Sequence, residues 1–403
     1  MIYLDNAATT KPLKEVQECV TEYISDKWYN PSALYKNGNQ VRSDIEKARK
    51  NIANFINANT DEIYFTSGAT ESNNWVLRGF VDYCVSNRIK PIIITSAIEH
   101  KSITDCLIGL MSVYSELRVY ETIVDKKTGF INYKHLQNIL QTVFKKYYNV
   151  EKYKILVSIQ YANSEIGTIQ NIKKISEIVH SYDGFLHTDA TQAFGHISIN
   201  VGYKHIDMLS ASSQKFGGLK GTGILYKSKY CDCIKPLIYG SQENSKRGGT
   251  ENVIGIMAMS KAVDCFDKTY NQVSYVVKMK KYFEKQLIDK FGCKINGHWI
   301  DDNNEMLRDC NEYRLPNNLN VTFPQNITGE ALIYMLDSAG IMISSGSACN
   351  SRTNQLSPVL KAIGLTDEEI MRTIRITIPD NITKEEIDIV VNEIDKIIKI
   401  LTS

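Results

Sequence analysis

The chain of 403 residues has almost no net charge: 47 lysines and arginines stand against 45 aspartates and glutamates, which leaves a formal charge of +2. So small an excess gives no electrostatic basis for broad binding to nucleic acid or to a membrane. The hydrophobic content of 43% is too high for a disordered chain, and the length corresponds to two or three domains. This composition leaves an enzyme or a large interaction module.

Long apolar runs are also missing. The longest, near residues 92 and 154, are far shorter than the ~20 residues that span a bilayer. The opening MIYLDNAATTKPLKEV lacks the basic and apolar regions of a secretory signal. The nine cysteines are an odd number and widely scattered, so no disulfide framework is indicated. We therefore expect a cytoplasmic protein with reduced thiols, in which Cys231 and Cys233 are incidental thiols rather than a metal site.

Between residues 60 and 225, short apolar runs rich in β-formers alternate with segments of helical spacing such as ESNNWVLRGFVDYC and IKKISEIVHSY. Nearly continuous apolar runs are typical of strands buried on both faces. The candidate strands lie at 62–67, 90–97, 153–161, 184–189, 205–212 and 221–227. This alternation predicts an α/β fold with a mostly parallel sheet and helices on both faces.

The pattern changes after residue 255. A long helical pattern over 254–291 precedes the strand candidates LNVTF and RITIP and an amphipathic helix over 384–403. We predict a large domain over 12–261 and a smaller α+β domain made of 1–11 and 262–403. The polar stretch 296–318 is expected to be an irregular insertion.

In a parallel sheet, ligands bind beyond the carboxyl ends of the strands. Polar residues follow five of the predicted strands: Thr66-Ser67-Gly68, Ile98-Glu99-His100, Asn163-Ser164-Glu165, Asp189-Ala190-Thr191-Gln192 and Ser212-Ser213-Gln214-Lys215. Because these strand ends meet at one edge of the sheet, we expect the five groups to form a single site.

One of these groups has the features of a phosphate site. Residues 66–71 (TSGATE) follow a strand and open a helix, and a helix amino terminus with nearby hydroxyl groups binds anions well. A capped helix after a tight turn explains the same residues equally well. Neither G-x-x-x-x-G-K-[ST] nor a G-x-G-x-x-G after the first strand is present, so ATP and NAD have no support.

Three further residues complete a set that suits pyridoxal phosphate. That cofactor needs a lysine for its aldehyde, an acid at its ring nitrogen, a ring stacked over it and a phosphate cradle. Lys215 lies between a strand and a glycine-rich loop, Asp189 closes another buried run, and His100 ends a third. Each alone has an ordinary alternative: a solvated lysine, or a histidine that serves the structure.

Two residues in the second half of the chain point to substrate chemistry. Cys349 lies among small residues in ISSGSACNSRTN, where an exposed thiol is better placed to react as thiolate than a buried one. Arg375 alternates with apolar residues on a predicted strand. An inward arginine needs an anion, which either a substrate carboxylate or a neighbouring acidic side chain would supply.

Taken together, these residues resemble a known family. The chain is similar, nearly end to end, to the NifS/IscS-type cysteine desulfurases, which are fold-type I, class V aminotransferase-like pyridoxal phosphate enzymes. The matching stretches are YLDNAATT (3–10), YNPSALYKNG (29–38), FTSGATESNN (65–74), AIEHKS (97–102), ANSEIGTIQ (162–170), HTDATQAFG (187–195), QKFGGLKGTGILY (214–226), GSQENSKRGGTEN (240–252), SSGSACNS (344–351) and IRIT (374–377). The resemblance implies a seven-stranded, mostly parallel sheet in the large domain, and SSGSAC is typical of the subgroup with its nucleophile on a long loop (about 344–356).

The resemblance also implies roles for individual residues. At the cofactor ring, Lys215 corresponds to the Schiff-base lysine, Asp189 to the partner of the ring nitrogen, His100 to the stacking and proton-transfer histidine, and Gln192 to the donor to the phenolic oxygen. The residues expected at the cofactor phosphate are Ala69, Thr70, Ser212 and, from the partner subunit of a homodimer, Thr250.

At the substrate, the resemblance implies that Arg375 grips the carboxylate, with Asn163 also binding substrate, and that Cys349 receives the sulfur as a persulfide. Two cofactor-binding positions depart from the family. Gln214 stands where a histidine usually precedes the lysine, and Ser164 replaces the second asparagine of N-N-E-[IT]-G. Both changes spare the reacting groups and suggest a specialised desulfurase.

The implied reaction converts L-cysteine into L-alanine and a persulfide on Cys349, which a sulfur-acceptor protein then receives. A selenocysteine lyase or another class V aminotransferase-like enzyme is an alternative within the same scaffold. A scaffold that binds sulfur-transfer partners without catalysis is an alternative of another class. We expect no membrane and no direct nucleic-acid partner, and the sequence leaves the destination of the sulfur open.

Overall fold

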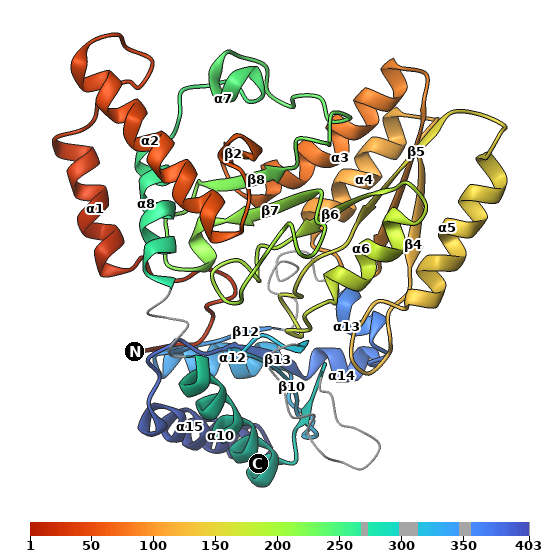
Figure 1. Ribbon diagram of the computed structural model, residues 1–403. Helices are drawn as coiled ribbons and strands as arrows, with labels where there is room; N and C mark the ends of the chain where they lie inside the picture. Colours follow the sequence, from red (N-terminus) through yellow and green to blue (C-terminus); the bar gives the residue numbers. More distant parts are fainter. Residues whose placement is uncertain (267–272, 298–312, 346–355, 403) are drawn as a thin grey trace.

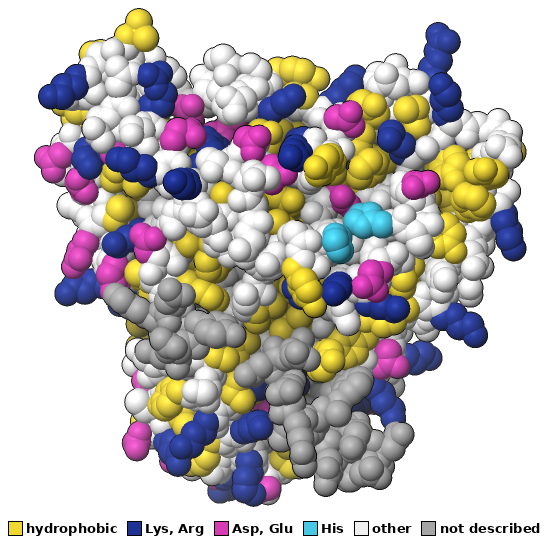
Figure 2. Space-filling model, viewed as in Figure 1, with side chains coloured by type: hydrophobic (Ala, Val, Ile, Leu, Met, Phe, Trp, Pro, Cys, Tyr) yellow, Lys and Arg dark blue, Asp and Glu magenta, His cyan; other side chains and the backbone are white. Residues whose placement is uncertain are grey.

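The computed structural model describes residues 1–266, 273–297, 313–345 and 356–402 (Figure 1). A seven-stranded sheet with its helices forms the upper part of the view, and a smaller sheet with α10, α12 and α15 forms the lower part. Basic and acidic side chains are interspersed over the face in Figure 2, in keeping with the near-zero net charge. Within the described ranges, no helix has both the length and the apolar character that crossing a bilayer requires.

The larger sheet has the strand order β2-β8-β7-β6-β5-β3-β4. Its members are β2 (Ile63–Thr66), β3 (Lys90–Ser96), β4 (Arg118–Thr122), β5 (Tyr153–Ser158), β6 (Phe185–Asp189), β7 (Met208–Ser212) and β8 (Gly223–Lys227). Only β8 runs against its two neighbours, so the predicted mostly parallel seven-stranded sheet is confirmed. The edge strand β4 escaped the sequence reading because its residues RVYET are largely polar and partly exposed.

Helices cover both faces of this sheet, as predicted. Successive strand residues point to opposite faces: Ile92 and Ile94 of β3 pack in one apolar cluster, and Ile93 packs in another. The first cluster includes residues of α1 (Lys14–Ser25), α2 (Lys36–Phe55), α5 (Tyr133–Tyr147), α6 (Ile172–His180) and α8 (Val253–Asp264). The second includes residues of α3 (Ala69–Ser86) and α4 (Lys101–Val113).

The smaller sheet has the order β12-β13-β10-β9, and a separate parallel pair joins β1 to β11. These strands are β1 (Ile2–Tyr3), β9 (Lys294–Ile295), β10 (Asn318–Thr322), β11 (Ile341–Met342), β12 (Ser344–Ser345) and β13 (Thr373–Thr377). The helices α10 (Val273–Phe291), α12 (Gly329–Ser338) and α15 (Lys384–Thr402) supply most of its apolar cluster, which also contains Leu4. The first residues therefore pack with the carboxyl-terminal part of the chain.

Some details differ from the sequence reading. The helical pattern over 254–291 forms two described helices, α8 and α10, with 267–272 outside the described residues. Most of the expected insertion (298–312) also lies outside them. Two short helices, α13 (Pro358–Ala362) and α14 (Asp367–Met371), pack on the core of the large sheet rather than on that of the small one. The exact domain boundaries therefore stay a prediction. The remaining short elements are η1 (Thr60–Glu62), η2 (Ser213–Lys215) and α7 (Gln242–Ser245).

Candidate active site

A pocket of about 390 Å³ opens where the carboxyl ends of the parallel strands meet. Residues that follow β2, β3, β5, β6 and β7 line it, and β13 of the smaller sheet adds one more. The predicted site residues in its lining are Ala69, Thr70, His100, Ser164, Asp189, Gln192, Ser212, Gln214, Lys215 and Arg375. The structure thus brings most of the predicted residues together at one edge of the sheet.

Lys215 ends the short helix η2 directly after β7. Its ammonium group donates to the backbone carbonyls of Ala7, at 2.9 Å, and Ala8, at 2.7 Å. Its own carbonyl is 2.9 Å from Nε2 of His196. The lysine is therefore held at both ends, and its amine lies in the same pocket as Asp189 and His100 rather than among apolar side chains.

Asp189 is the last residue of β6 and is 7% exposed. Its Oδ1 accepts from the backbone N–H of Thr191 at 2.9 Å, and its Oδ2 accepts from Nδ2 of Asn73 at 2.8 Å. Both carboxylate oxygens thus have a fixed donor. Gln192, one turn further on, donates through Nε2 to the carbonyl of Ala7 at 3.0 Å.

The turn from β2 into α3 has the geometry of an anion cradle. Gly68 adopts φ 152° and ψ 173°, a conformation that side chains rarely allow. Ala69 and Thr70 then begin an 18-residue helix, whose first N–H groups lack partners within the helix. Ser212 Oγ donates to Oε1 of Gln214 at 2.8 Å. This bond uses the oxygen of the Gln214 amide and not its NH₂ group.

An ion pair closes one side of this cradle. Arg247 donates to the carboxylate of Glu71 through Nε, at 2.8 Å, and through Nη2, at 3.1 Å. Burial opposes ionisation of Glu71, but these bonds and those from Ser67 outweigh it and lower the pKa of the carboxyl. The pair neutralises a carboxylate that would otherwise repel an anion at the helix terminus.

Arg375 lies on β13, is 4% exposed, and pairs with Asp5, with Nη2 2.7 Å from Oδ1. Its Nη1 donates to the carbonyl of Ser164 at 3.3 Å, and its buried Nε has no hydrogen-bond partner among the described residues. The acidic neighbour considered as an alternative from the sequence is therefore present. The Nε–H of the guanidinium nevertheless remains for another acceptor.

Two glutamates to which the sequence analysis gave no role hydrogen-bond to residues around the site: Glu99, which is buried, and Glu165, which is half-buried. Burial raises the pKa of Glu99 to about 8, although Ser96 and the N–H of Gln160 donate to its carboxyl group. Burial likewise raises the pKa of Glu165 to about 7, against a hydrogen bond from Ser357 and the nearby charge of Arg375. Glu99 fixes the turn before His100 to the turn after β5.

Two predicted residues are not in this lining, and a third is not described by the structure. Asn163 is buried, and its amide group bonds to the backbone. Its Nδ2 donates to the carbonyl of Ile98, and its Oδ1 accepts from the N–H groups of Glu165 and Ile166. It shapes the turn, and the structure does not place it in the pocket lining. Thr250 is exposed and also outside the pocket of its own chain. Cys349 lies outside the described residues.

The residues present fit pyridoxal phosphate. The volume is in the range of small-molecule sites, a lysine and a carboxylate face the same space, and a helix terminus offers N–H groups for a phosphate. Two buried polar atoms of the lining, Oγ1 of Thr191 and Nε of Arg375, have no partner among the described residues. Unpaired buried polar atoms are costly, so a bound polar ligand would stabilise them.

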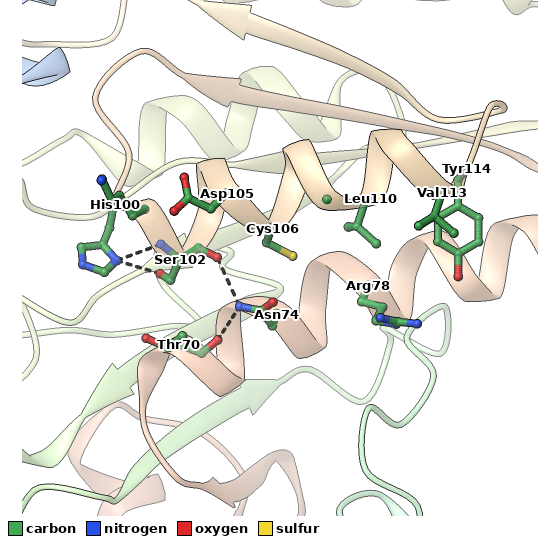
Figure 3. A pocket seen from close by; sticks show the side chains of 12 residues that line it. Thr70, Asn74, Arg78, His100, Ser102, Asp105, Cys106, Leu110, Val113 and Tyr114 are labelled. Atoms are coloured by element: carbon green, nitrogen blue, oxygen red, sulfur yellow. Dashed lines mark hydrogen bonds between the residues drawn. The ribbon is translucent and has the colours of Figure 1, made fainter. Parts of the chain in front are cut away.

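A second pocket, of about 630 Å³, lies beside the first between α3 and α4 (Figure 3). Thr70, His100 and Ser102 line both pockets, so the two spaces adjoin at the start of these helices. Cys106 is in this second lining, and burial raises the pKa of its thiol to about 11.

The buried Cys231 and Cys233 lie in the apolar cluster with α3 and α4, and burial likewise raises the pKa of both thiols.

Comparison with known proteins places this geometry in a family. The model of the aminotransferase class-V family matches residues 2–390. Cysteine desulfurase IscS of Dictyoglomus turgidum is 39% identical over 99% of this chain and 94% of its own length. The solved structure of a NifS-like protein superposes with a TM-score of 0.85 at 31% identity and covers 99% of both chains. A structure described as SspA in complex with cysteine reaches a TM-score of 0.76 at 32% identity, over 94% of this chain and 99% of that one.

A family model that spans nearly the whole chain, full-length relatives and full-length structural neighbours all point to the same family. The chain belongs to the class V aminotransferase family and, within it, to the NifS/IscS group of cysteine desulfurases.

Proposed function

We propose that this protein is a pyridoxal phosphate-dependent cysteine desulfurase that removes sulfur from L-cysteine as a persulfide on Cys349 and passes it to an acceptor protein. The observation that carries the proposal is the convergence of Lys215, Asp189, His100 and Arg375 on one pocket in a chain 39% identical to an IscS desulfurase. The similarity to a structure with bound cysteine supports the choice of substrate.

Lys215, Asp189, Gln192 and His100 would hold the cofactor ring, with Ala69, Thr70, Ser212 and Gln214 at its phosphate. When bound, pyridoxal phosphate supplies an electron sink for the bonds of the substrate α-carbon. Lys215 then moves the α-proton through its amine, and Asp189 keeps an acceptor at the ring nitrogen. Arg375 binds the substrate carboxylate, with Nε as the donor that the protein leaves unused.

Cys349 acts on the substrate sulfur. Its thiolate forms a new sulfur–sulfur bond while the carbon–sulfur bond of the substrate breaks, and the carbon takes a proton, so that alanine leaves. Described residues near both ends of the segment of Cys349 contact the surroundings of the pocket. Ser344 pairs with Arg375 of the lining across β12 and β13, and Ser357 donates to Glu165, the neighbour in sequence of Ser164 in the lining. This placement supports a nucleophile that reaches the substrate from the side of the smaller sheet.

The same proposal includes a homodimer in which Thr250 of one subunit completes the phosphate site of the other. Thr250 is exposed and lies outside the pocket of its own chain, which suits this role. We also place the protein in the cytoplasm, where thiols stay reduced. Among the described cysteines, Cys19, Cys84, Cys106, Cys231, Cys233 and Cys293 form no disulfide.

The test is turnover of L-cysteine by the purified protein loaded with pyridoxal phosphate. We expect one alanine for each sulfur released as sulfide in the presence of a thiol reductant. Cys349→Ser should abolish sulfur release and keep the visible absorbance of the cofactor, and Cys106→Ser is the matched control that should keep both. Absence of alanine from the unaltered protein would favour the non-catalytic scaffold, and turnover of selenocysteine alone would favour the lyase.

A further inference from the structure

A chain of hydrogen bonds joins Asp189 to His100 through two side chains that the proposed mechanism does not use. Nδ2 of Asn73, on α3, lies 2.8 Å from Oδ2 of Asp189 and 2.8 Å from Oγ of Ser102, on α4. Oγ of Ser102 lies 2.9 Å from Nδ1 of His100. Asn73 is fully buried, and Ser102, which lines both pockets, is 9% exposed.

The direction of the first two bonds follows from the carboxylate. An ionised Asp189 can only accept hydrogen bonds, so the group of Asn73 that faces it must be the NH₂. The reversed amide would bring a carbonyl oxygen against a carboxylate oxygen in a buried site, which is unfavourable. The second hydrogen of the same NH₂ then points to the Ser102 hydroxyl, which accepts it.

The direction of the last bond follows from the helix cap. His100 is the N-cap of α4, and its Nδ1 accepts from the backbone N–H of Ser102 at 3.1 Å. A backbone N–H can only donate, so Nδ1 of neutral His100 carries no hydrogen. The Ser102 hydroxyl, having accepted from Asn73, donates its own hydrogen to the same nitrogen. Both contacts are drawn in Figure 3.

We propose that Asn73 and Ser102 are positioning residues that hold neutral His100 as its Nε2–H tautomer, so that the imidazole meets the ligand of the pocket as a hydrogen-bond donor. An acceptor on the ligand, such as a ring oxygen or a thiolate sulfur, suits this donor. The identity of the ligand rests on the proposed function, but the tautomer does not. To cap the helix, His100 needs only the N–H of Ser102. The hydroxyl of Ser102 and the amide of Asn73 additionally connect His100 to the carboxylate of Asp189.

The tautomer is measured directly by ¹⁵N NMR of the ring nitrogens in the cofactor-loaded protein with labelled histidine, with the His100 signals assigned by their loss in His100→Gln. We expect a protonated Nε2 and an unprotonated Nδ1 at a pH where His100 is neutral. A protonated Nδ1 would overturn the proposal. If the ring shows the expected tautomer but the protein forms no alanine, the proposed function fails and this inference stands.

Variants test the two links. In Ser102→Ala and Asn73→Leu, Nδ1 of His100 should accept weaker or fewer hydrogen bonds, and its resonance should therefore move downfield. Both variants should also lower kcat about two- to tenfold, as expected for the loss of one hydrogen bond. Ser102→Thr keeps a hydroxyl and should retain the signal and the rate. Asn74→Ala is the matched control, because Asn74 donates to the carbonyl of Ser102 and not to its hydroxyl, and its ring signals should be unchanged. A fall in kcat without a ring shift in Ser102→Ala would contradict the role in positioning.

Discussion

The two sheets contribute to the pocket in different ways. The seven-stranded sheet presents its residues from the ends of its strands and the turns that follow them. Asn73 of α3 holds Asp189 there, and the carbonyls of Ala7 and Ala8 hold Lys215. Among the described residues, the four-stranded sheet contributes one to the lining, Arg375, from the interior of strand β13. An inward-facing cation at that position needs a counter-charge, which Asp5 supplies from the start of the chain. In the proposed function, the larger sheet would therefore hold the cofactor, and the smaller sheet would supply the cation that binds the substrate carboxylate.

The strongest test of the part played by the larger sheet is Lys215→Ala. Because the proposed reaction needs this amine both to attach the cofactor and to move a proton, we expect turnover to fall at least about 10²- to 10⁴-fold and the visible band of the attached cofactor to disappear. Absorbance and alanine formation measure the two effects. Lys220→Ala, in the exposed part of the same glycine-rich loop, is the control, and an unchanged spectrum in Lys215→Ala would remove the lysine from its role.

Arg375→Met tests the smaller sheet. Loss of a guanidinium that binds a carboxylate should lower kcat/KM for L-cysteine about 10- to 100-fold, the value of one or two charge-assisted hydrogen bonds. Most of the effect should be on KM, while the cofactor spectrum should persist. Arg372→Met, on the same segment but outside the pocket lining, should have little effect on KM. Equal KM values for the two variants would show that Arg375 pairs with Asp5 and does not bind the substrate carboxylate.

A smaller effect is expected on the pH dependence of stability, through Glu99, which joins two turns of the larger sheet. Burial raises the pKa of Glu99 to about 8 from an ordinary value of 4.5, so the folded protein binds a proton that the unfolded chain has lost between these pH values. Stability should therefore decrease as the pH rises from 5 to 8. Glu99→Gln should remove about 3 to 4 kcal/mol of that decrease, at about 1.4 kcal/mol for each unit of the shift that lies between these pH values. Urea unfolding at both pH values measures it, and identical pH dependence in both proteins would contradict an unusual pKa.

The smallest effect is expected for Gln214→His. A histidine can carry charge next to a phosphate, and a charge-assisted hydrogen bond exceeds a neutral one by about 1 kcal/mol. We expect affinity for pyridoxal phosphate to rise about fivefold below neutral pH. Equilibrium dialysis or fluorescence titration measures this affinity. Weaker binding would show that the bond from Ser212 to Gln214 matters more than charge.

The sequence predicted the pocket well because strand ends are easy to find. Buried parallel strands appear as apolar runs, and the polar residues after them must converge on one edge; Asp189, His100 and Lys215 were found in this way. Asn73 and Ser102 could not be found so, because they lie within helices, and helical spacing does not show which residue of a neighbouring helix faces them. Asn163 shows a second reason why sequence is not enough. It follows a strand as predicted, but its amide bonds to backbone groups of the turns and does not line the pocket.

The first ten residues connect the two sheets. β1 pairs with β11 beside the smaller sheet, while the carbonyls of Ala7 and Ala8 hold the ammonium of Lys215 and Thr10 bonds to the backbone of Gln214. Trimming this segment would remove a strand, the counter-ion of Arg375 and the anchor of the reactive amine in one step. A purification tag should therefore be fused to the other end of the polypeptide.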